Sequence, residues 1–135
     1  MAKKTWTEKR DTKKEFILKT IDKKFADIPG GSKMPITTPL IIDDYVKCIP
    51  FGKTGDMSTM RNDLAIEYGA DKTCPVTSGI FLRIASEAAY EEIITGKSIM
   101  EVTPFWLIVE PSSKLAKKLQ CGVEFIEAQR QNEGI

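Results

Sequence analysis

The clearest structural pattern in the sequence lies at residues 57 to 96, MSTMRNDLAIEYGADKTCPVTSGIFLRIASEAAYEEIITG. Its first part has the pattern of an amphipathic helix, with Ser58 as the cap and Gly69 as the closing residue. Apolar residues recur every four positions in this helix and form one face, which consists of Met60, Leu64 and Tyr68.

A second, longer helix is predicted to begin only a few residues later. Thr73 stands at its cap position, Pro75 lies in its first turn, and Gly96 marks its end. Two helices joined by a short turn that contains glycine are typical of a helix-turn-helix.

Flanking segments complete the predicted domain. The stretch TTPLIIDDYVKCIP, residues 37 to 50, predicts a helix that Thr38 caps and Pro50 stops. Residues 102–110 have the character of a strand, and residues 122–134 predict a closing helix. We therefore expect a mainly α-helical fold with a small β ribbon, arranged as a winged helix-turn-helix.

The first 37 residues read as a basic N-terminal extension that precedes a domain at residues 38–135. A short helix is expected from Thr7 to Lys14. Residues 1–24 hold nine Lys or Arg against four Asp or Glu, although the net charge of the chain is only +1. Such an arm favours contact with nucleic acid, and a solvated, partly helical tail is the alternative.

The composition limits the functional classes. The chain has 135 residues, 41% of them hydrophobic and 29% charged, which is typical of one soluble globular domain. No apolar run approaches the roughly 18 residues of a membrane helix, and the N-terminus lacks the apolar core of a secretory signal. Three widely spaced cysteines indicate free thiols in the cytoplasm. The absence of histidine excludes His-dependent catalysis and His-ligated metals within this chain, and no metal or cofactor is predicted.

The N-terminal part of the long predicted helix is the candidate DNA-binding element. Free N–H groups and the helix dipole attract phosphate there, and small hydroxyl side chains permit a close approach. The candidate contacts are Lys72, Thr73, Thr77, Ser78 and, as the one cation on the outer face, Arg83.

The C-terminal half of the same helix opposes DNA because it is acidic, through Glu87, Glu91 and Glu92. An ordinary amphipathic helix with a solvated polar face is the alternative to a recognition helix.

Cys74 has the most reactive predicted environment of the three thiols. It lies at a predicted helix N-terminus beside Lys72, where the thiolate form is stabilised. A buried, inert cysteine is the alternative.

Four stretches together resemble the C-terminal DNA-binding domain of the O6-alkylguanine-DNA alkyltransferases, and more closely the small methyltransferase-like proteins. The resemblance runs from Ile42 to Gly134. The stretches are IPFGKTGDMSTMRNDLA (49–65), GADKTCPVTSGIFLRIASEAA (69–89), TPFWLIV (103–109) and GVEFIEAQRQNEG (122–134).

The chain departs from that family at the acceptor motif, Pro-Cys-His-Arg-Val. Phe105 takes the position of the alkyl-accepting cysteine, Trp106 that of the histidine, and Leu107 that of the arginine. Glu133 matches the glutamate that orients the histidine in the family, and the family's nucleotide-extruding tyrosine falls near Met57. Alkyl transfer to Phe105 is excluded because a phenyl ring is not a nucleophile.

The resemblance implies a binding function without this chemistry. Alkyltransferase-like proteins with a tryptophan in place of the cysteine bind alkylated DNA and flag it for other repair proteins. In this chain the implied pocket residues are Met57, Phe105, Trp106 and Glu133. Phe105 and Trp106 either fill that pocket or line it and stack on a flipped base.

The function that the resemblance implies is therefore non-enzymatic binding of double-stranded DNA, including alkylated DNA, by minor-groove insertion of the helix, with a repair protein as the candidate partner. Two alternatives stay open. One is a protein-interaction module on a degenerate alkyltransferase fold, which the acidic body favours. The other is a residual alkyl acceptor that uses Cys74.

Overall fold

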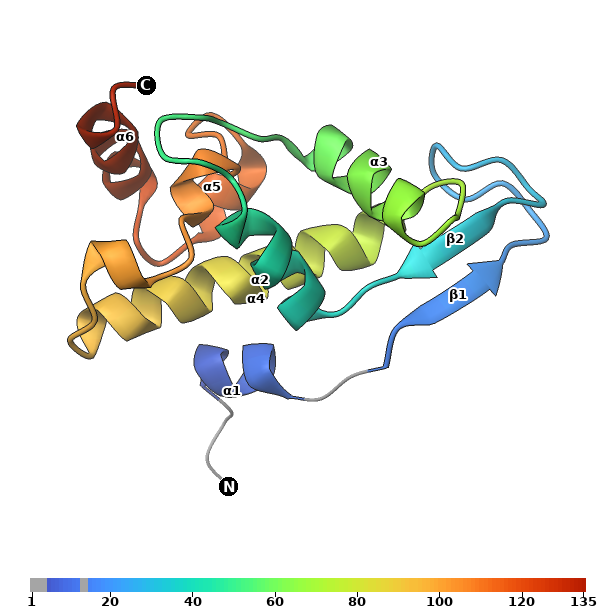
Figure 1. Cartoon of the computed structure of the whole chain (residues 1–135), viewed down its shortest axis with the longest axis horizontal. Coiled ribbons are helices and arrows are strands. Elements are labelled where there is room, and N and C mark those ends of the chain that lie inside the picture. Colours follow the sequence, from blue (N-terminus) through green and yellow to red (C-terminus); the bar gives the residue numbers. More distant parts are fainter. Residues whose placement is uncertain (1–4, 13–14) are drawn as a thin grey trace.

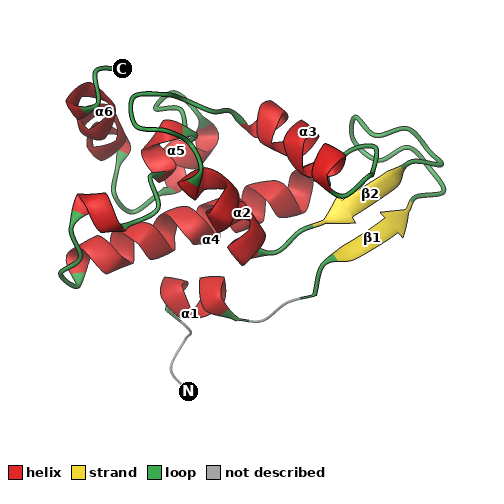
Figure 2. Cartoon of the chain, in the orientation of Figure 1, coloured by secondary structure: helices red, strands yellow, loops and turns green. Residues whose placement is uncertain are grey.

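The computed structural model describes residues 5–12 and 15–135 (Figure 1). This part of the chain is mostly helical, with a small antiparallel sheet of two strands, which confirms the predicted mainly α-helical fold with a β ribbon (Figure 2). The elements are α1 (Trp6–Asp11), β1 (Ile17–Thr20), β2 (Lys33–Ile36), α2 (Pro39–Lys47), α3 (Met57–Glu67), α4 (Pro75–Ile94), the 3-10 helices η1 (Ile99–Glu101) and η2 (Phe105–Leu107), α5 (Lys114–Lys118) and α6 (Val123–Asn132). No helix among the described residues is long and apolar enough to cross a membrane.

Helix α4 is the centre of the molecule, and α1, α2 and α3 all pack against it (Figure 1). Pro75 begins the helix with a fixed backbone angle, and Thr95 ends it before Gly96, whose φ of 118° leaves the helical region. Its buried face includes Phe81, Leu82 and a row of alanines, so the backbones of neighbouring helices approach closely.

The start of α4 differs from the prediction by one residue. Cys74, not Thr73, is the N-cap, and its side chain makes no capping hydrogen bond. Thr73 is instead buried, and its hydroxyl donates to the backbone oxygen of Arg61 at 2.7 Å. The hydroxyl that we expected to cap α4 therefore holds the N-terminal end of α4 against α3.

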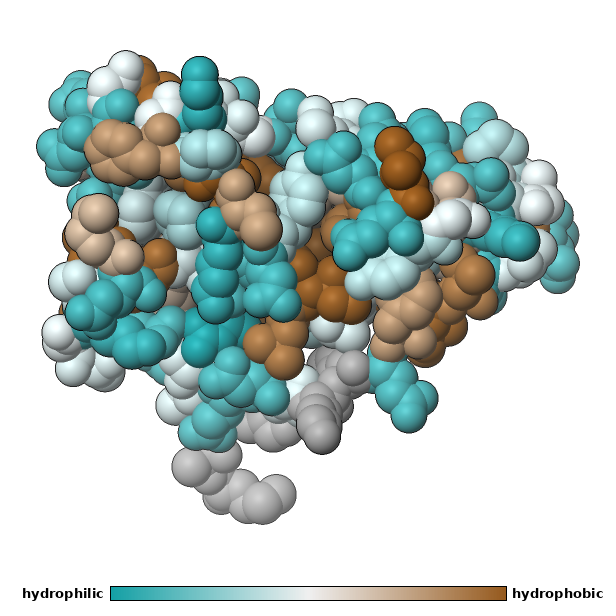
Figure 3. Space-filling view, in the orientation of Figure 1, coloured by the Kyte–Doolittle hydropathy of each residue, from teal (hydrophilic) through white to brown (hydrophobic). Residues whose placement is uncertain are grey.

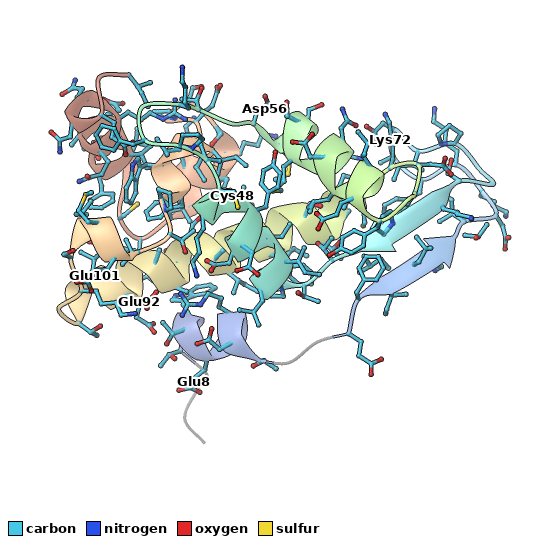
Figure 4. The ribbon with its side chains drawn as sticks, in the orientation of Figure 1. Glu8, Cys48, Asp56, Lys72, Glu92 and Glu101 are labelled. Carbon is cyan, nitrogen blue, oxygen red and sulfur yellow. The ribbon has the colours of Figure 1, made fainter. Side chains whose placement is uncertain are left out.

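Helix α3, in contrast, begins earlier than predicted. Asp56 is the N-cap, and its carboxylate accepts from the backbone N–H of Thr59 at 2.8 Å (Figure 4). Ser58, the predicted cap, lies inside the first turn. The predicted turn after the helix is present, with Gly69 at a φ of 62°.

The predicted strand at residues 102–110 is wrong. The backbone closes tight turns there, because the N–H groups of Ile108 and Val109 both donate to the carbonyl of Phe105. Residues 105–109 are all buried, whereas a two-faced strand would expose alternate side chains. The β ribbon lies instead in the N-terminal segment, where Ile17 pairs with Ile36 and Thr20 with Lys33.

The main core lies between α2, α3, α4, η2 and α6. Its largest fully buried side chains include Phe105, Ile42, Met60 and Leu82. Figure 3 shows hydrophilic side chains over much of one face, with apolar side chains gathered near β1, where Ile17 and Leu18 are exposed.

The N-terminal segment packs on the rest of the chain at two places. The predicted short helix is α1, which ends at Asp11, whereas residues 13 and 14 of the prediction lie outside the described residues. Helix α1 lies along α4, and β2 accepts the N–H of Cys74 through the carbonyl of Pro35 at 3.0 Å. The boundary at residue 38 stays a prediction.

Candidate nucleic-acid interface

A groove of about 440 Å³ lies on the outer side of α4, and α1, α3 and α5 form its other walls. Among the described residues, the charged side chains that line this groove are all cations, and none is acidic. We call it the cationic groove; its lining residues are Trp6, Lys9, Met57, Gly79, Ile80, Arg83, Ile84, Leu115 and Lys118.

Two cations of the cationic groove meet one aromatic ring. The Nζ of Lys9 lies 4.3 Å from the centroid of the Trp6 ring, and the guanidinium carbon of Arg83 lies 5.5 Å from it. Cations at such distances are attracted to the ring and keep their charge. The charged side chains around this ring are therefore positive.

The acidic residues of α4 do not face the cationic groove, contrary to our expectation that they oppose an anionic ligand. Glu87 is buried, and its Oε1 accepts from the backbone N–H of Gln120 at 3.1 Å. Its Oε2 lies 3.8 Å from the Nε of Arg83.

Glu91 is used to hold α1. Its carboxylate accepts from the backbone N–H groups of Trp6 and Thr7, each at 3.2 Å, and from the hydroxyl of Thr7 at 2.8 Å. Burial favours the neutral form of Glu91, but these hydrogen bonds outweigh it and lower the pKa of the carboxyl. Glu91 thus caps α1 as an anion.

Glu92 completes the attachment of α1. It forms ion pairs with Arg10 at 2.5 Å and with Lys97 at 2.6 Å. Burial opposes ionisation of Glu92, and the hydrogen bonds from the two cations outweigh it, so its pKa is also lowered. Two of the three acidic groups of α4 are therefore bound within the molecule, Glu91 by hydrogen bonds from α1 and Glu92 by ion pairs.

The predicted DNA contacts do not form one surface. Arg83 lines the cationic groove, but Lys72 lies near the ribbon end of the molecule, with its Nζ 3.4 Å from a carboxylate oxygen of Asp27 (Figure 4). Thr73 and Ser78 are buried, so their hydroxyls do not face solvent. Thr77 is half-buried, and its hydroxyl oxygen is covered.

Phe105 is fully buried, with 0% of its surface exposed. Its ring meets Trp106 edge-on at 5.3 Å between centroids and stacks parallel to Phe125 at 6.0 Å. These contacts make Phe105 a core residue and leave no face of its ring free for a base.

Trp106 is bound to Glu133 by its indole nitrogen, which donates to the carboxylate. The other carboxylate oxygen accepts from the backbone N–H of Gly52 at 2.9 Å, and Arg130 donates to the carbonyl of Trp106 at 2.7 Å. Glu133 therefore fixes the side chain that stands at the position of the family's histidine.

A second cavity, of about 600 Å³, lies beside Trp106 and Glu133, away from Met57. Its walls are largely apolar, and Phe51 and Met100 at its edge are 68% and 82% exposed. The four predicted pocket residues are thus divided between the cationic groove, this second cavity and the core.

Trp6, Lys9 and Lys118 belong to the cationic groove, but we did not predict them. The excess of cations in residues 1–24 is the signal that points to Lys9, and the stretch KLAKK at 114–118 points to Lys118. No local pattern predicts Trp6, because its position depends on the docking of α1 on α4.

Cys74 lies in a small apolar cluster with Ile21, Ile28 and Met34, and only 4% of it is exposed. It is not accessible at the surface, whereas Cys48 is exposed. Burial and the nearby Glu87 raise the pKa of the Cys121 thiol to about 11. Among the described residues there is no group of three or more His, Cys, Asp or Glu side chains placed to hold a metal ion.

No family model matches this chain, and no curated protein and no solved structure matches it either. Three features bear on the function of the chain. They are the cationic groove, the site around Phe105 that is filled by the rings of Phe105, Trp106 and Phe125, and the resemblance of the four sequence stretches.

Proposed function

We propose that this chain is a non-enzymatic DNA-binding protein of alkyltransferase-like type, in which α3 and α4 act as the helix-turn-helix of a winged-helix domain. The observation that carries the proposal is the cationic groove on the outer side of α4. A groove with cations and no acids along a helix complements the phosphates of double-stranded DNA.

Gly79 supports the insertion of α4 into a DNA groove. It lines the cationic groove, and a Cβ added to it would meet no atom within 4 Å. Packing within the protein therefore does not require glycine, although glycine weakens a helix by about 1 kcal/mol relative to alanine. A close approach of DNA to the helix backbone gives a reason for its presence.

The filled site around Phe105 supports a role in binding without alkyl transfer. In the alkyltransferases a glutamate orients a histidine, and here Glu133 bonds to Trp106, which cannot act as a base. If a nucleotide is extruded, it would occupy the cationic groove beside Met57 or the second cavity beside Trp106, because Phe105 is enclosed.

A titration of fluorescent duplex DNA tests this function, with an unmodified duplex and one that contains O6-methylguanine. We expect Arg83→Ala and Lys118→Ala each to weaken DNA binding several-fold. Each should also make the negative slope of log affinity against log salt shallower by about one. Lys117→Ala is the matched control, since Lys117 is exposed on the same helix as Lys118 but does not line the groove. Equal effects of Lys117→Ala and Lys118→Ala would remove the groove from the proposal.

A protein-interaction module is the second candidate. The second cavity favours it, because its apolar walls and the exposed Phe51 and Met100 suit a protein partner. This function predicts no DNA binding even at about 50 mM salt, where electrostatic binding is strong.

The burial of Cys74 argues against the third reading, an alkyl acceptor. We expect no methyl adduct on Cys74 by mass spectrometry after incubation with the O6-methylguanine duplex. An adduct on that thiol would make the chain an alkyl acceptor after all.

A further inference from the structure

Helix α1 completes the cationic groove, although the sequence places it in an extension outside the predicted DNA-binding domain. We propose that Lys9 of α1 and Arg83 of α4 together bind one phosphate group of the DNA strand, and that Trp6, whose ring contacts both cations, is their positioning residue. This inference rests on the proposed function and names a contact that the recognition helix alone does not provide.

The position of α1 is set by contacts outside the groove. Glu91 accepts the first N–H groups of α1, and Glu92 binds Arg10. These anchors lie toward the C-terminal half of α4, and they leave the Lys9 side chain in the groove. The docking of α1, and not an ion pair of Lys9, therefore places the Lys9 side chain in the groove.

The Trp6 ring offsets part of the repulsion between Lys9 and Arg83. Two cations that converge on one small groove repel each other, and a carboxylate placed between them would cancel the charge that a phosphate needs. The Trp6 ring attracts both Lys9 and Arg83 without neutralising either. Arg83 is also ion-paired with the buried carboxylate of Glu87 at 3.8 Å, so the charge left for an anion comes mainly from Lys9 and from the exposed part of Arg83.

Arg83 has hydrogen-bonding capacity that the protein leaves unused. Its Nε is covered and has no hydrogen-bond partner among the described residues. Glu87 lies 3.8 Å from that nitrogen, which is longer than a hydrogen bond. The Arg83 side chain is 40% exposed, so the oxygens of a bound phosphate would meet its other guanidinium nitrogens, and a forked guanidinium suits phosphate oxygens.

The test compares Lys9→Ala with Lys117→Ala in duplex titrations over a range of salt. We expect Lys9→Ala to weaken binding several-fold and to lower the salt slope by about one, whereas Lys117→Ala leaves both near those of the parent. Lys9 contacts the protein through the Trp6 ring, so its removal leaves the anchors of α1 in place.

Trp6 is tested by two substitutions. Trp6→Phe keeps an aromatic face and should retain most of the affinity, whereas Trp6→Leu keeps an apolar side chain and should reproduce the loss seen for Lys9→Ala. A merely structural role would make the two variants alike. Inorganic phosphate is then compared with chloride at matched ionic strength as a competitor of DNA binding. If phosphate weakens DNA binding more than chloride does, the site also binds free phosphate. If the two salts weaken it equally, the site needs the DNA strand.

The inference is overturned if Lys9→Ala binds DNA as Lys117→Ala does while Arg83→Ala is weakened, and the proposed function then stands without α1. If the parent protein does not bind DNA at low salt, the proposed function itself fails. A free-phosphate site in a protein that does not bind DNA also overturns the inference.

Discussion

The indole nitrogen of Trp106 donates a hydrogen bond to the carboxylate of Glu133, and this contact joins η2 to the end of α6. The same carboxylate also accepts the N–H of Gly52 from the loop that follows α2. One ionised side chain thereby connects three segments that are distant in the sequence. Both carboxylate oxygens are occupied by donors of the protein, and they hold these three segments together.

Replacing Glu133 should weaken the fold. Glu133→Ala removes acceptors from Trp106 and Gly52, and hydrogen bonds to a charged group typically contribute about 1.5–3 kcal/mol to the free energy of unfolding. Urea unfolding measures the loss. Glu127→Ala on the exposed side of α6 is the control and should change stability by at most about 0.5 kcal/mol. Similar losses for both variants would contradict the structural role of Glu133.

Phe105 should contribute more than any exposed aromatic residue of the chain. Phe105→Ala removes a fully buried ring, and substitutions of this kind cost about 3–5 kcal/mol of stability. Phe51→Ala is the comparison, because Phe51 is largely exposed and its loss should be within about 0.5 kcal/mol. Thermal or urea unfolding of the two variants checks the difference, and a small effect at Phe105 would mean that its site is open.

Gly79→Ala should raise stability and lower DNA affinity at once. The added methyl group meets open space in the protein, and alanine favours the helix over glycine by about 1 kcal/mol. The same methyl group stands in the cationic groove, where it obstructs a ligand that approaches the backbone. Unfolding and DNA titration of one variant measure both effects. Unchanged affinity would show that DNA does not approach α4 at this point.

The attachment of α1 should depend on pH. The carboxyls of Glu91 and Glu92 have lowered pKa values in the folded protein, so their stabilising contribution is complete above the ordinary glutamate pKa near 4.5 and is lost as pH falls further. We expect hydrogen exchange of the amides of residues 5–12, measured as protection factors relative to free chain at each pH, to show release of α1 on acidification toward about pH 3.

Glu91→Gln and Glu92→Gln are the matched variants for that experiment. Each should release α1 already at neutral pH, because it replaces the charge that caps the helix or binds Arg10. Loss of protection in α1 without loss in α4 is the expected result. If α1 stays protected in both variants, contacts other than these carboxylates hold it.

Local signals were sufficient to predict α2, α3, α4 and α6 from the sequence, whereas α5 and the two 3-10 helices were not predicted. Caps, prolines and glycines mark the ends of α2, α3 and α4, and the predicted closing helix contains α6. Thr38 caps α2 as predicted, whereas the caps of α3 and α4 are Asp56 and Cys74 in place of the neighbouring Ser58 and Thr73. A side chain such as Thr73 is drawn away by a partner, Arg61, that only the tertiary structure supplies.

The region around Phe105 could not be assigned from its pattern. A short apolar run is compatible with a buried strand and with a buried turn, and here the turn occurs because the surrounding helices enclose every side chain. The cationic groove was equally out of reach. It combines Lys9, Arg83 and Lys118 from three helices, and their proximity follows from the docking of α1 on α4 and from the position of α5 at the same groove.

Arg61 links the angle between α3 and α4 to the N-terminal segment. Its Nε donates to the carbonyl of Thr73 at 2.9 Å, and its two terminal nitrogens bind the carboxylate of Asp27. The turn between the two helices is therefore clamped from outside, and it does not act as a free hinge. Under the proposed function, the helix pair would meet DNA as a preformed rigid body, so that any adjustment on binding falls to the nucleic acid.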